Sequence, residues 1–442
     1  MSTQTRIISP SGISEGLHRL EFYASDKTGT RSNVKSVSFT RLKVFNVRDY
    51  GAKGDGITGD TKAIKAAIDA ARDYINTNTT TPTNTTTAPY AIVYFPSGDY
   101  FIGQSGAIEY TGLSRIIFRG DNANNTRIIR NNNAGTLFRF ISCSDLQFRN
   151  LNYYFTGPSR TTALQFRTSI SNLIIDSCIF SRDTRNDATY YSDPNIAPYD
   201  YIAFMTQTTS TTATMSNITI TNNQFYDAPE DCIAFKVGGW QPMTLDGPLR
   251  IEGNRFIRVS SSHRLTLNNE PRPGAAITYS NPSTERAFIS IRNNYFECTA
   301  EYRHSIAIGY NRFRNCIIEG NTVRGFTQGI RAFVGYGTDK ASYNVMIRNN
   351  TLDGRDLTGT PNIYPFGSSV DAWRNSGIVI HGENISVDGN TVQYYGLYGF
   401  YLYYIDRSAN IPSTNVTLTS NNTIANNNRA GYSWVRDIGY EM

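Results

Sequence analysis

Two short hydrophobic patterns alternate along most of the chain. The first reads Asn217-Ile-Thr-Ile-Thr-Asn-Asn-Gln-Phe225, in which apolar and polar residues alternate up to an Asn-Asn pair. The second reads Asp231-Cys-Ile-Ala-Phe235, a short apolar run with a carboxylate at its start. Alternation with a period of two predicts half-buried β-strands, and a short apolar run predicts a buried strand.

Both patterns recur to the end of the chain at intervals of 27 to 45 residues. The corner that closes the first pattern falls at Leu151, Cys178, Asn223, Asn254, Asn294, Asn321, Asn350, Asn390 and Asn422. The second pattern falls once in each interval. Asn and Gly tolerate the left-handed backbone that a sharp bend requires. Strand, corner, short strand and variable loop together predict one coil of a parallel β-helix.

The repeat therefore predicts an all-β fold, a right-handed parallel β-helix. No single coil can bury its inner face, so about nine stacked coils make one domain rather than several. We assign residues 43–442 to this catalytic or binding domain and residues 1–42 to an N-terminal β segment. Two alternating stretches within residues 16–39 predict a β-hairpin around an Asp-Lys-Thr-Gly turn. It resembles the last hairpin of a bacterial immunoglobulin-like domain, so we interpret the segment as a remnant or a linker.

Two further stretches carry the clearest family resemblance. They are Val44-Phe-Asn-Val-Arg-Asp-Tyr-Gly-Ala-Lys-Gly-Asp-Gly-Ile-Thr-Gly-Asp-Thr-Lys-Ala-Ile64 and Ala91-Ile-Val-Tyr-Phe-Pro-Ser-Gly-Asp-Tyr100. We expect a helix after the first stretch, with Asp60 as its cap. Its apolar face is formed by Ile64, Ala67, Ile68, Ala71 and Ile75. The two stretches resemble the opening of the pectin lyase-like superfamily, shared by polygalacturonases and many phage tailspike depolymerases. The resemblance implies the β-helix, and we expect the helix to close its N-terminal end.

Composition narrows the range of functions. The formal net charge is +6 over 442 residues, and Lys and Arg are scattered without runs, so we expect no nucleic acid partner. No apolar run is long enough to span a membrane, and the first residues do not read as a signal peptide, so we expect no membrane insertion. The five cysteines predict buried free thiols. No cluster has metal-ligand spacing, and we expect no cofactor.

Candidate chemistry lies two residues before the Ile of each short strand. That position holds Asp200, Asp231, Ala275, His304, Gln328 and Ser376 in successive coils. Neighbouring strands lie about 4.8 Å apart, so Asp200 and Asp231 would be neighbours with Glu230 beside them. Such carboxylate pairs serve glycosidases, because one acid's pKa is raised by its charged neighbour. The alternative is a row of polar residues that merely terminates strands.

Three further short segments also resemble polygalacturonases. They are Glu230-Asp-Cys-Ile-Ala-Phe-Lys-Val-Gly-Gly239, Arg303-His-Ser-Ile-Ala-Ile-Gly309 and Gly329-Ile-Arg331. The resemblance implies that Asp231 is the acid, that Glu230 and Asp200 are its partner carboxylates, and that His304 assists. For substrate binding we expect Arg331, Lys236, Trp240 and Tyr199. One departure is an additional coil, containing residues 276–279, between Asp231 and His304.

These observations predict a glycoside hydrolase that degrades a polysaccharide with paired carboxylates. By resemblance, we expect a tailspike-like depolymerase of a bacterial surface glycan, a homotrimer located outside the cell or on a virion surface. A lyase or epimerase acting on a uronic-acid polymer is one alternative; it would use a Tyr, Lys or His base near Arg331. A glycan-binding or receptor-binding β-helix without turnover is the other alternative.

Overall fold

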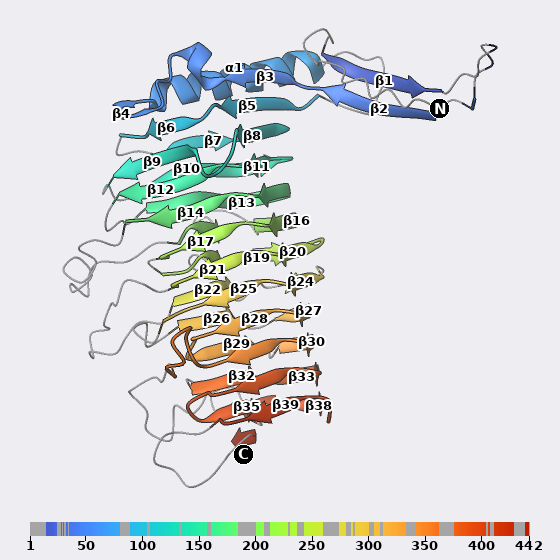
Figure 1. The fold of residues 1–442 in the computed structure, drawn as a ribbon, viewed down its shortest axis with the longest axis vertical. Helices are drawn as coiled ribbons and strands as arrows, with labels where there is room; N and C mark the ends of the chain where they lie inside the picture. The colour runs from blue at the N-terminus through green and yellow to red at the C-terminus, as the bar shows by residue number, and fades with distance from the viewer. Residues whose placement is uncertain are drawn as a thin grey trace.

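The fold is seen in a computed structural model, which describes most of the chain in segments. The described residues are 15–23, 28, 30, 32–33, 35–79, 89–103, 107–131, 135–156, 161–183, 200–206, 213–228, 230–236, 243–259, 274–279, 284–285, 288–299, 305–309, 313–332, 342–361, 375–403, 405–406, 411–427 and 438–441. Over these residues the chain forms a long stack of coils with α1 and the N-terminal hairpin at one end (Figure 1).

Parallel pairing between successive coils builds one extended sheet and a second, 12-stranded sheet in the described part of the chain. We call one run of the extended sheet the site face. It contains β7 (Ile108–Thr111), β10 (Gly135–Ser144), β13 (Thr161–Asp176), β15 (Ile202–Met205), β18 (Ile233–Lys236), β22 (Gly274–Tyr279), β26 (Ser305–Gly309), β29 (Gln328–Ala332), β32 (Ser376–Ile380), β35 (Tyr398–Tyr403) and β40 (Ile438–Glu441).

The second face continues the same sheet. It contains β3 (Lys43–Asn46), β5 (Ala91–Phe95), β8 (Ile116–Gly120), β11 (Gln147–Arg149), β16 (Ala213–Thr221), β19 (Met243–Leu245), β20 (Leu249–Glu252), β23 (Thr284–Glu285), β24 (Ile289–Arg292), β27 (Arg314–Glu319), β30 (Ser342–Arg348), β33 (Gly382–Asp388) and β38 (Thr414–Leu418). The long strands β10 and β13 pair along both faces.

The 12-stranded sheet is the third face. It contains β4 (Asp55–Gly59), β6 (Gly98–Phe101), β9 (Thr126–Asn131), β12 (Asn152–Thr156), β14 (Ile179–Arg182), β17 (Gln224–Tyr226), β21 (Arg255–Ile257), β25 (Tyr295–Glu297), β28 (Thr322–Arg324), β31 (Thr351–Asp353), β34 (Thr391–Gln393) and β39 (Thr423–Ala425). The predicted right-handed parallel β-helix is confirmed.

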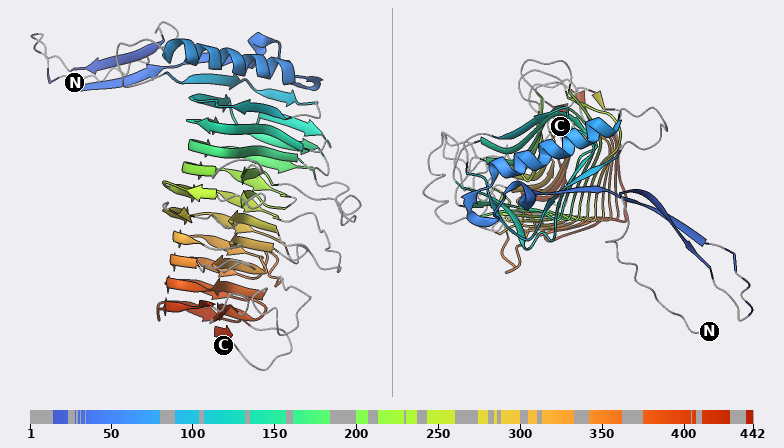
Figure 2. Two further views of the ribbon diagram at one scale, coloured as in Figure 1. Left: turned by 180° about the vertical axis from the view of Figure 1, so that it is seen from behind. Right: turned by 90° about the horizontal axis from the view of Figure 1, so that it is seen from above.

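The N-terminal end of the stack is covered by the helix α1 (Thr61–Thr79), which lies across the first coils (Figure 2). Its predicted apolar face is buried, as the exposures of 0–1% for Ile64, Ala67, Ile68, Ala71 and Ile75 show. The strands β1 (Gly16–Phe22) and β2 (Lys35–Arg41) form an antiparallel hairpin that projects away from the stack. Among the described residues, no helix is long and apolar enough to cross a membrane.

The predicted cap at Asp60 is wrong in its detail. The buried Asp60 carboxylate accepts the backbone N–H groups of Lys53 at 2.6 Å, Gly54 at 3.2 Å and Phe101 at 3.3 Å. It therefore ties the preceding turn to strand β6 instead of capping the first turn of α1. A carboxylate can satisfy several buried amide donors at once, and this turn supplies them.

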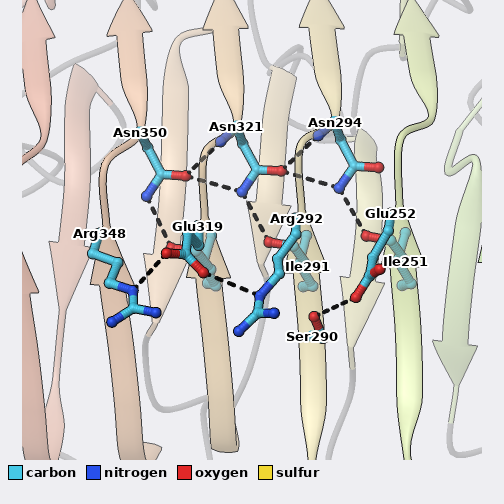
Figure 3. A network of polar contacts seen from close by, with 11 residues as sticks. Ile251, Glu252, Ser290, Ile291, Arg292, Asn294, Glu319, Asn321, Arg348 and Asn350 are labelled. Atoms are coloured by element: carbon cyan, nitrogen blue, oxygen red, sulfur yellow. Dashed lines mark hydrogen bonds and ion pairs between the residues drawn. The ribbon is translucent and has the colours of Figure 1, made fainter.

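A ladder of buried asparagines forms the corner between the second and third faces. Its members are the buried Asn223, Asn254, Asn294, Asn321, Asn350 and Asn390, and the half-buried Asn422 at its end. Asn321 is typical (Figure 3): its Nδ2 donates to Asn350 Oδ1 and to the Ile291 carbonyl, both at 2.9 Å. Its Oδ1 accepts the backbone N–H and the Nδ2 of Asn294, both at 3.0 Å. Each coil is therefore bonded to the coils on both sides.

The residue before each ladder asparagine except Asn422 has the left-handed backbone that the sequence predicts. Asn222, Asn293 and Asn349 have φ between 53° and 55°, and Gly320 and Gly389 have φ of 64° and 62°. Glycine is required by space as well as by conformation at position 320. A Cβ there would lie 2.5 Å from the Oδ1 of Asn293.

Stacked aromatic rings fill the core beside the ladder. Phe180, Phe225, Phe256 and Phe296 stack in successive coils, with ring centroids 4.7–4.9 Å apart. On the site face, Phe204 and Phe235 stack at 4.4 Å. All five cysteines are free and buried, as predicted. The core is therefore continuous from coil to coil.

Replacing Asn321 with Ala should lower the free energy of unfolding by about 3–5 kcal/mol, because each buried polar group left unpaired costs about 1–3 kcal/mol. Urea unfolding measures this. Asn344→Gly is the matched control: it removes an exposed bond to Asn315 but keeps a residue that tolerates positive φ. Equal losses in the two variants would contradict the role given to the buried ladder.

Candidate active site

The register of two strands brings Asp200 and Asp231 together at one end of the site face. Strands β15 and β18 pair Ile202 with Ile233, so the residues two positions earlier are neighbours. The N–H of Tyr201 donates to the Asp231 carbonyl at 3.1 Å, which extends the pairing to this point. Both aspartates are buried, with 5% of each residue exposed. The predicted adjacency of these two carboxylates is thus present in the structure.

Lys236, at the end of β18, reaches the same place. Its Nζ lies 2.8 Å from Asp200 Oδ1, 3.3 Å from Asp231 Oδ2 and 3.8 Å from Glu230 Oε2. These distances limit the separation of Asp200 Oδ1 and Asp231 Oδ2 to about 6 Å, which admits the spacing of roughly 5–5.5 Å found in retaining glycosidases. We call these four residues the carboxylate centre. In this structure Lys236 is an ion-pair partner of the three acids.

Each aspartate also accepts a backbone N–H group, Asp200 from Asp231 and Asp231 from Ala275. The backbone N–H of Ala275, in the next coil, donates to Asp231 Oδ1 at 2.7 Å. A backbone N–H stabilises the ionised form of a carboxylate. Lys236 Nζ approaches the other oxygen of Asp231, so both of its oxygens face a donor. Sequence reasoning missed Ala275 as a contributor, because a main-chain donor has no signature in residue type.

This setting perturbs the pKa of Asp200. Burial raises the pKa of Asp200 to about 6; the charge of Lys236 lowers it and the charge of Asp231 raises it. For Lys236, burial alone would lower the pKa. The attraction of Asp200, Asp231 and Glu230 outweighs burial and raises the pKa above the ordinary value. The centre thus combines a carboxyl group that holds its proton near pH 6 with a fixed ammonium group.

The predicted place of His304 in the row is wrong. Strand β26 pairs Ile308 with Ile277 and with Ile330, so Ile306 takes the position beside Ala275. His304 lies two residues earlier in the chain. Isoleucines at both 306 and 308 satisfy the alternating pattern, and the sequence alone could not choose between them. His304, Trp240 and Tyr199 lie outside the described residues.

Arg331 lies on the site face but is remote from the carboxylate centre. The strand register places Ala234 beside Thr278. Thr278 in turn neighbours Gly309 in the next coil, and Gly309 pairs with Arg331 in the coil after that. Three steps at about 4.8 Å each amount to roughly 14 Å along the axis. The additional coil predicted from the sequence is β22, which contributes one of these steps. Arg331 is buried, with 6% of the residue exposed.

The fold and this centre define a class, a parallel β-helix protein with a buried carboxylate centre on one face. Residues 44–234 match the family described as rhamnogalacturonase A/epimerase, pectate lyase-like. This match confirms the resemblance to the pectin lyase-like superfamily, and it includes the first stretch, the helix and the three carboxylates.

Individual relatives are similar over short stretches only. The chain is 48% identical over 73 residues to alginate lyase 7 of Azotobacter vinelandii, covering 16% of this chain and 7% of that protein. It is 49% identical over 49 residues to the exo-poly-α-D-galacturonosidase of Dickeya chrysanthemi, covering 11% of this chain and 8% of that protein. The alignments thus span less than a tenth of either relative's length.

Solved structures are similar over much more of the chain, at low identity. The surface adhesin PfbA of Streptococcus pneumoniae has a TM-score of 0.47 at 14% identity, covering 90% of this chain and 100% of that one. The Dettilon tailspike protein also has a TM-score of 0.47 at 14% identity, covering 90% of this chain and 68% of that one. The activity of this chain has to be argued from its own residues.

Replacing Lys236 with Met should destabilise the protein by about 3–5 kcal/mol at pH 8, because it leaves buried carboxylates without a countercharge. The loss should shrink at pH 5. Without the ammonium group the native carboxyl groups bind protons that the unfolded chain has released, so stability rises as pH falls. Thermal unfolding at both pH values measures the effect.

The control is Arg292→Met, which removes a partly exposed ion pair with Glu319. It should cost no more than about 1 kcal/mol at either pH. A Lys236→Met loss of the same size at pH 5 and pH 8 would show that lost packing, not charge, causes the destabilisation.

Proposed function

We propose that this protein is a glycoside hydrolase that cleaves a polysaccharide at the carboxylate centre. One observation carries the proposal: a half-buried ammonium group, Lys236 Nζ, lies within 3.8 Å of carboxylates from two neighbouring coils. Like charges gathered at one place lower the stability of the folded protein, so a function is the simplest reason for keeping them together. Carboxyl groups with perturbed pKa values are typical of catalytic sites. A row that merely terminates strands needs no such charge cluster.

We assign the roles by the environment of each carboxyl group. Asp200, whose pKa is raised to about 6, is the general acid that protonates the leaving oxygen. Asp231, which Lys236 and the Ala275 N–H contact, acts on the sugar or on a water molecule. Family resemblance alone gives the acid role to Asp231, so this assignment reverses it. Glu230, with 26% of its side chain exposed, borders the pair on the solvent side.

For the substrate we propose an acidic polysaccharide of a bacterial surface. The guanidinium group of Arg331 suits a carboxylate or phosphate substituent, which it can bind through two parallel hydrogen bonds. Tyr199 and Trp240 remain proposed substrate contacts, as does assistance by His304. The tailspike-like role, the homotrimer and a location outside the cell or on a virion surface are parts of the same proposal.

A lyase or epimerase is the second candidate, favoured by the similarity to alginate lyase 7. Such an enzyme needs a base that removes a proton beside the sugar carboxylate. Lys236 does not suit this role, because its neighbours raise its pKa and keep it an ammonium group. A lyase would therefore need a base other than Lys236, and its product would absorb in the ultraviolet.

Replacing Asp200 or Asp231 with Asn should lower the cleavage rate by about 10²–10⁴-fold and preserve glycan binding, because each removes one acid or base. The measurement is a screen against capsular polysaccharides, lipopolysaccharides and polygalacturonate, following new reducing ends and ultraviolet absorbance together. Asp246→Asn, at an exposed position, is the control for charge and should cleave normally. Ultraviolet-absorbing products would contradict hydrolysis, and glycan retained without any cleavage would indicate a binding protein.

The pH dependence tests the assignment of the acid. Because Asp200 must be protonated, kcat/KM should fall as pH rises above about 6. Lys236→Met should move this fall to higher pH, since the ammonium group holds the pKa of Asp200 down. A rate that falls already between pH 4 and pH 5, or a Lys236→Met profile that does not move, would remove Asp200 from the acid role.

A further inference from the structure

The connection between β17 and β18 carries two of the three acids. Residues 227–232 join these strands, and Glu230 and Asp231 lie among them. The corresponding connections in the coils before and after it are much longer, residues 183–201 and 258–273. The place of Asp231 in the carboxylate centre therefore depends on how the two ends of this short connection are held. We call residues 227–232 the acid connection.

Tyr201 bonds to both ends of the acid connection. It follows Asp200 in the coil before and directly precedes β15. Its hydroxyl group donates to the carbonyl of Tyr226, the residue before the connection, at 2.6 Å. Its backbone N–H donates to the carbonyl of Asp231 at 3.1 Å. One residue of the neighbouring coil therefore spans the acid connection from its start to its acid.

Tyr201 is in turn fixed by the core, and only 1% of the residue is exposed. Its ring stacks on Phe155 with the centroids 6.0 Å apart, and the ring centroid of Phe180 is also 6.0 Å away. Its carbonyl accepts the N–H groups of Ala163 and Leu164, both at 3.0 Å. A side chain in a close-packed core cannot follow a displaced partner. The core therefore sets the position of the hydroxyl group, and the hydroxyl group holds the connection.

Asp227 anchors the start of the acid connection to the coils on both sides. Arg258, in the next coil, donates from Nε to Asp227 Oδ1 at 2.6 Å and from Nη2 to Oδ2 at 2.8 Å. Arg182, in the coil before, donates from Nε to the Asp227 carbonyl at 2.5 Å. Asp227 has a φ of 57°, a left-handed conformation that aspartate adopts more readily than most residues. The chain therefore leaves the third face in a fixed direction.

We propose that Tyr201 is a positioning residue that keeps Asp231 beside Asp200 by holding the acid connection, with the Asp227–Arg258 ion pair as its second anchor. Tyr201 acts through the main chain and does not touch the sugar, so it is not a catalytic residue. The proposal rests on the proposed hydrolase function wherever it concerns the rate. It concerns the carboxylates of the protein without substrate as well, so the two proposals can be tested separately.

Tyr201→Phe removes the hydroxyl group and keeps the packing of the ring. We expect kcat on the polysaccharides of the screen to fall about 10- to 100-fold, because a displacement of roughly 1 Å at a reacting group has an effect of this size. The KM should change little, since no contact with the substrate is lost. The measurement is steady-state release of reducing ends by the full-length protein.

Tyr100→Phe is the matched control, because it removes a hydroxyl group in an equivalent setting far from the carboxylate centre. Tyr100 is fully buried, and its hydroxyl group donates to the Pro96 carbonyl at 2.8 Å. Both variants should lower the melting temperature to a similar extent, but only Tyr201→Phe should lower kcat. Equal losses of kcat in the two variants would show that Tyr201 contributes stability alone, and the proposal would be overturned.

Four titratable or charged groups lie around Asp200 in the part of the chain that the structure describes. Burial and the charge of Asp231 raise the pKa of Asp200, whereas Lys236 lowers it. Glu230 lies on the far side of Lys236, 3.8 Å from its Nζ. Burial raises the pKa of the Cys232 thiol well above its ordinary value, so this group stays neutral. Lys236 is part of β18 and pairs with that sheet, so loosening the acid connection leaves it in place.

An infrared titration of the Asp200 carboxyl band tests the positioning without any substrate. In Tyr201→Phe water should reach Asp200 and Asp231 should move away from it, so the midpoint should fall by about one pH unit. Tyr100→Phe should leave the midpoint where the wild-type protein has it. An unchanged midpoint in Tyr201→Phe would overturn the proposal even if the rate falls.

Arg258→Met tests the second anchor, and the sign of its effect separates two causes. Loss of a positive charge would by itself raise the pKa of Asp200, because a cation favours the ionised form of a carboxyl group. A loosened acid connection lowers that pKa instead. We therefore expect the midpoint to fall in Arg258→Met, as in Tyr201→Phe. A midpoint that rises or stays constant would remove the ion pair from the proposal.

The two readouts together distinguish the positioning role from the hydrolase. A midpoint that falls in Tyr201→Phe, in a protein that cleaves none of the polysaccharides, supports the positioning role and contradicts the hydrolase. Cleavage by the wild-type protein with an unchanged midpoint and an unchanged kcat in Tyr201→Phe preserves the hydrolase and overturns the positioning role.

Discussion

The hydrogen bonds of the buried asparagine ladder are the interaction on which the rest of the structure depends. Each ladder amide bonds to the coil before it and the coil after it, so no coil can slip in register without leaving several buried groups unpaired. The loops can therefore vary widely in length while the stacking stays constant. The site face is in register because the opposite corner fixes it.

The same constant stacking creates the chemistry of the carboxylate centre. At one corner it places amides beside amides, which satisfy each other as donor and acceptor. On the site face it places Asp200 beside Asp231, and these repel each other. Lys236 offsets this repulsion, and burial is the main cause of the raised pKa of Asp200. A local conflict inside an otherwise consistent structure is typical of a functional site.

Sequence predicted the features that depend on period and residue type. The Asn-Gly corners and the adjacency of Asp200 and Asp231 follow from the repeated pattern, and the buried face of α1 follows from the helical spacing of its apolar residues. The sequence-based prediction failed where two registers fitted the pattern equally. Either Ile306 or Ile308 could align with Ile277, and the structure aligns Ile308. The sequence also could not reveal that Lys236 folds back to the carboxylates or that the Ala275 N–H reaches Asp231. Those contacts depend on side-chain direction and on main-chain donors.

Burial raises the pKa of Asp200 to about 6, and the role of general acid depends on the proton that Asp200 keeps there. The most direct measurement is an infrared titration of the carboxyl bands, recorded as the difference between the wild-type protein and Asp200→Asn without any substrate. We expect a band of protonated carboxyl that disappears with a midpoint near pH 6 as the pH rises, and that is absent from the Asp200→Asn variant. A midpoint below pH 4, as for an exposed aspartate, would contradict a raised pKa of Asp200.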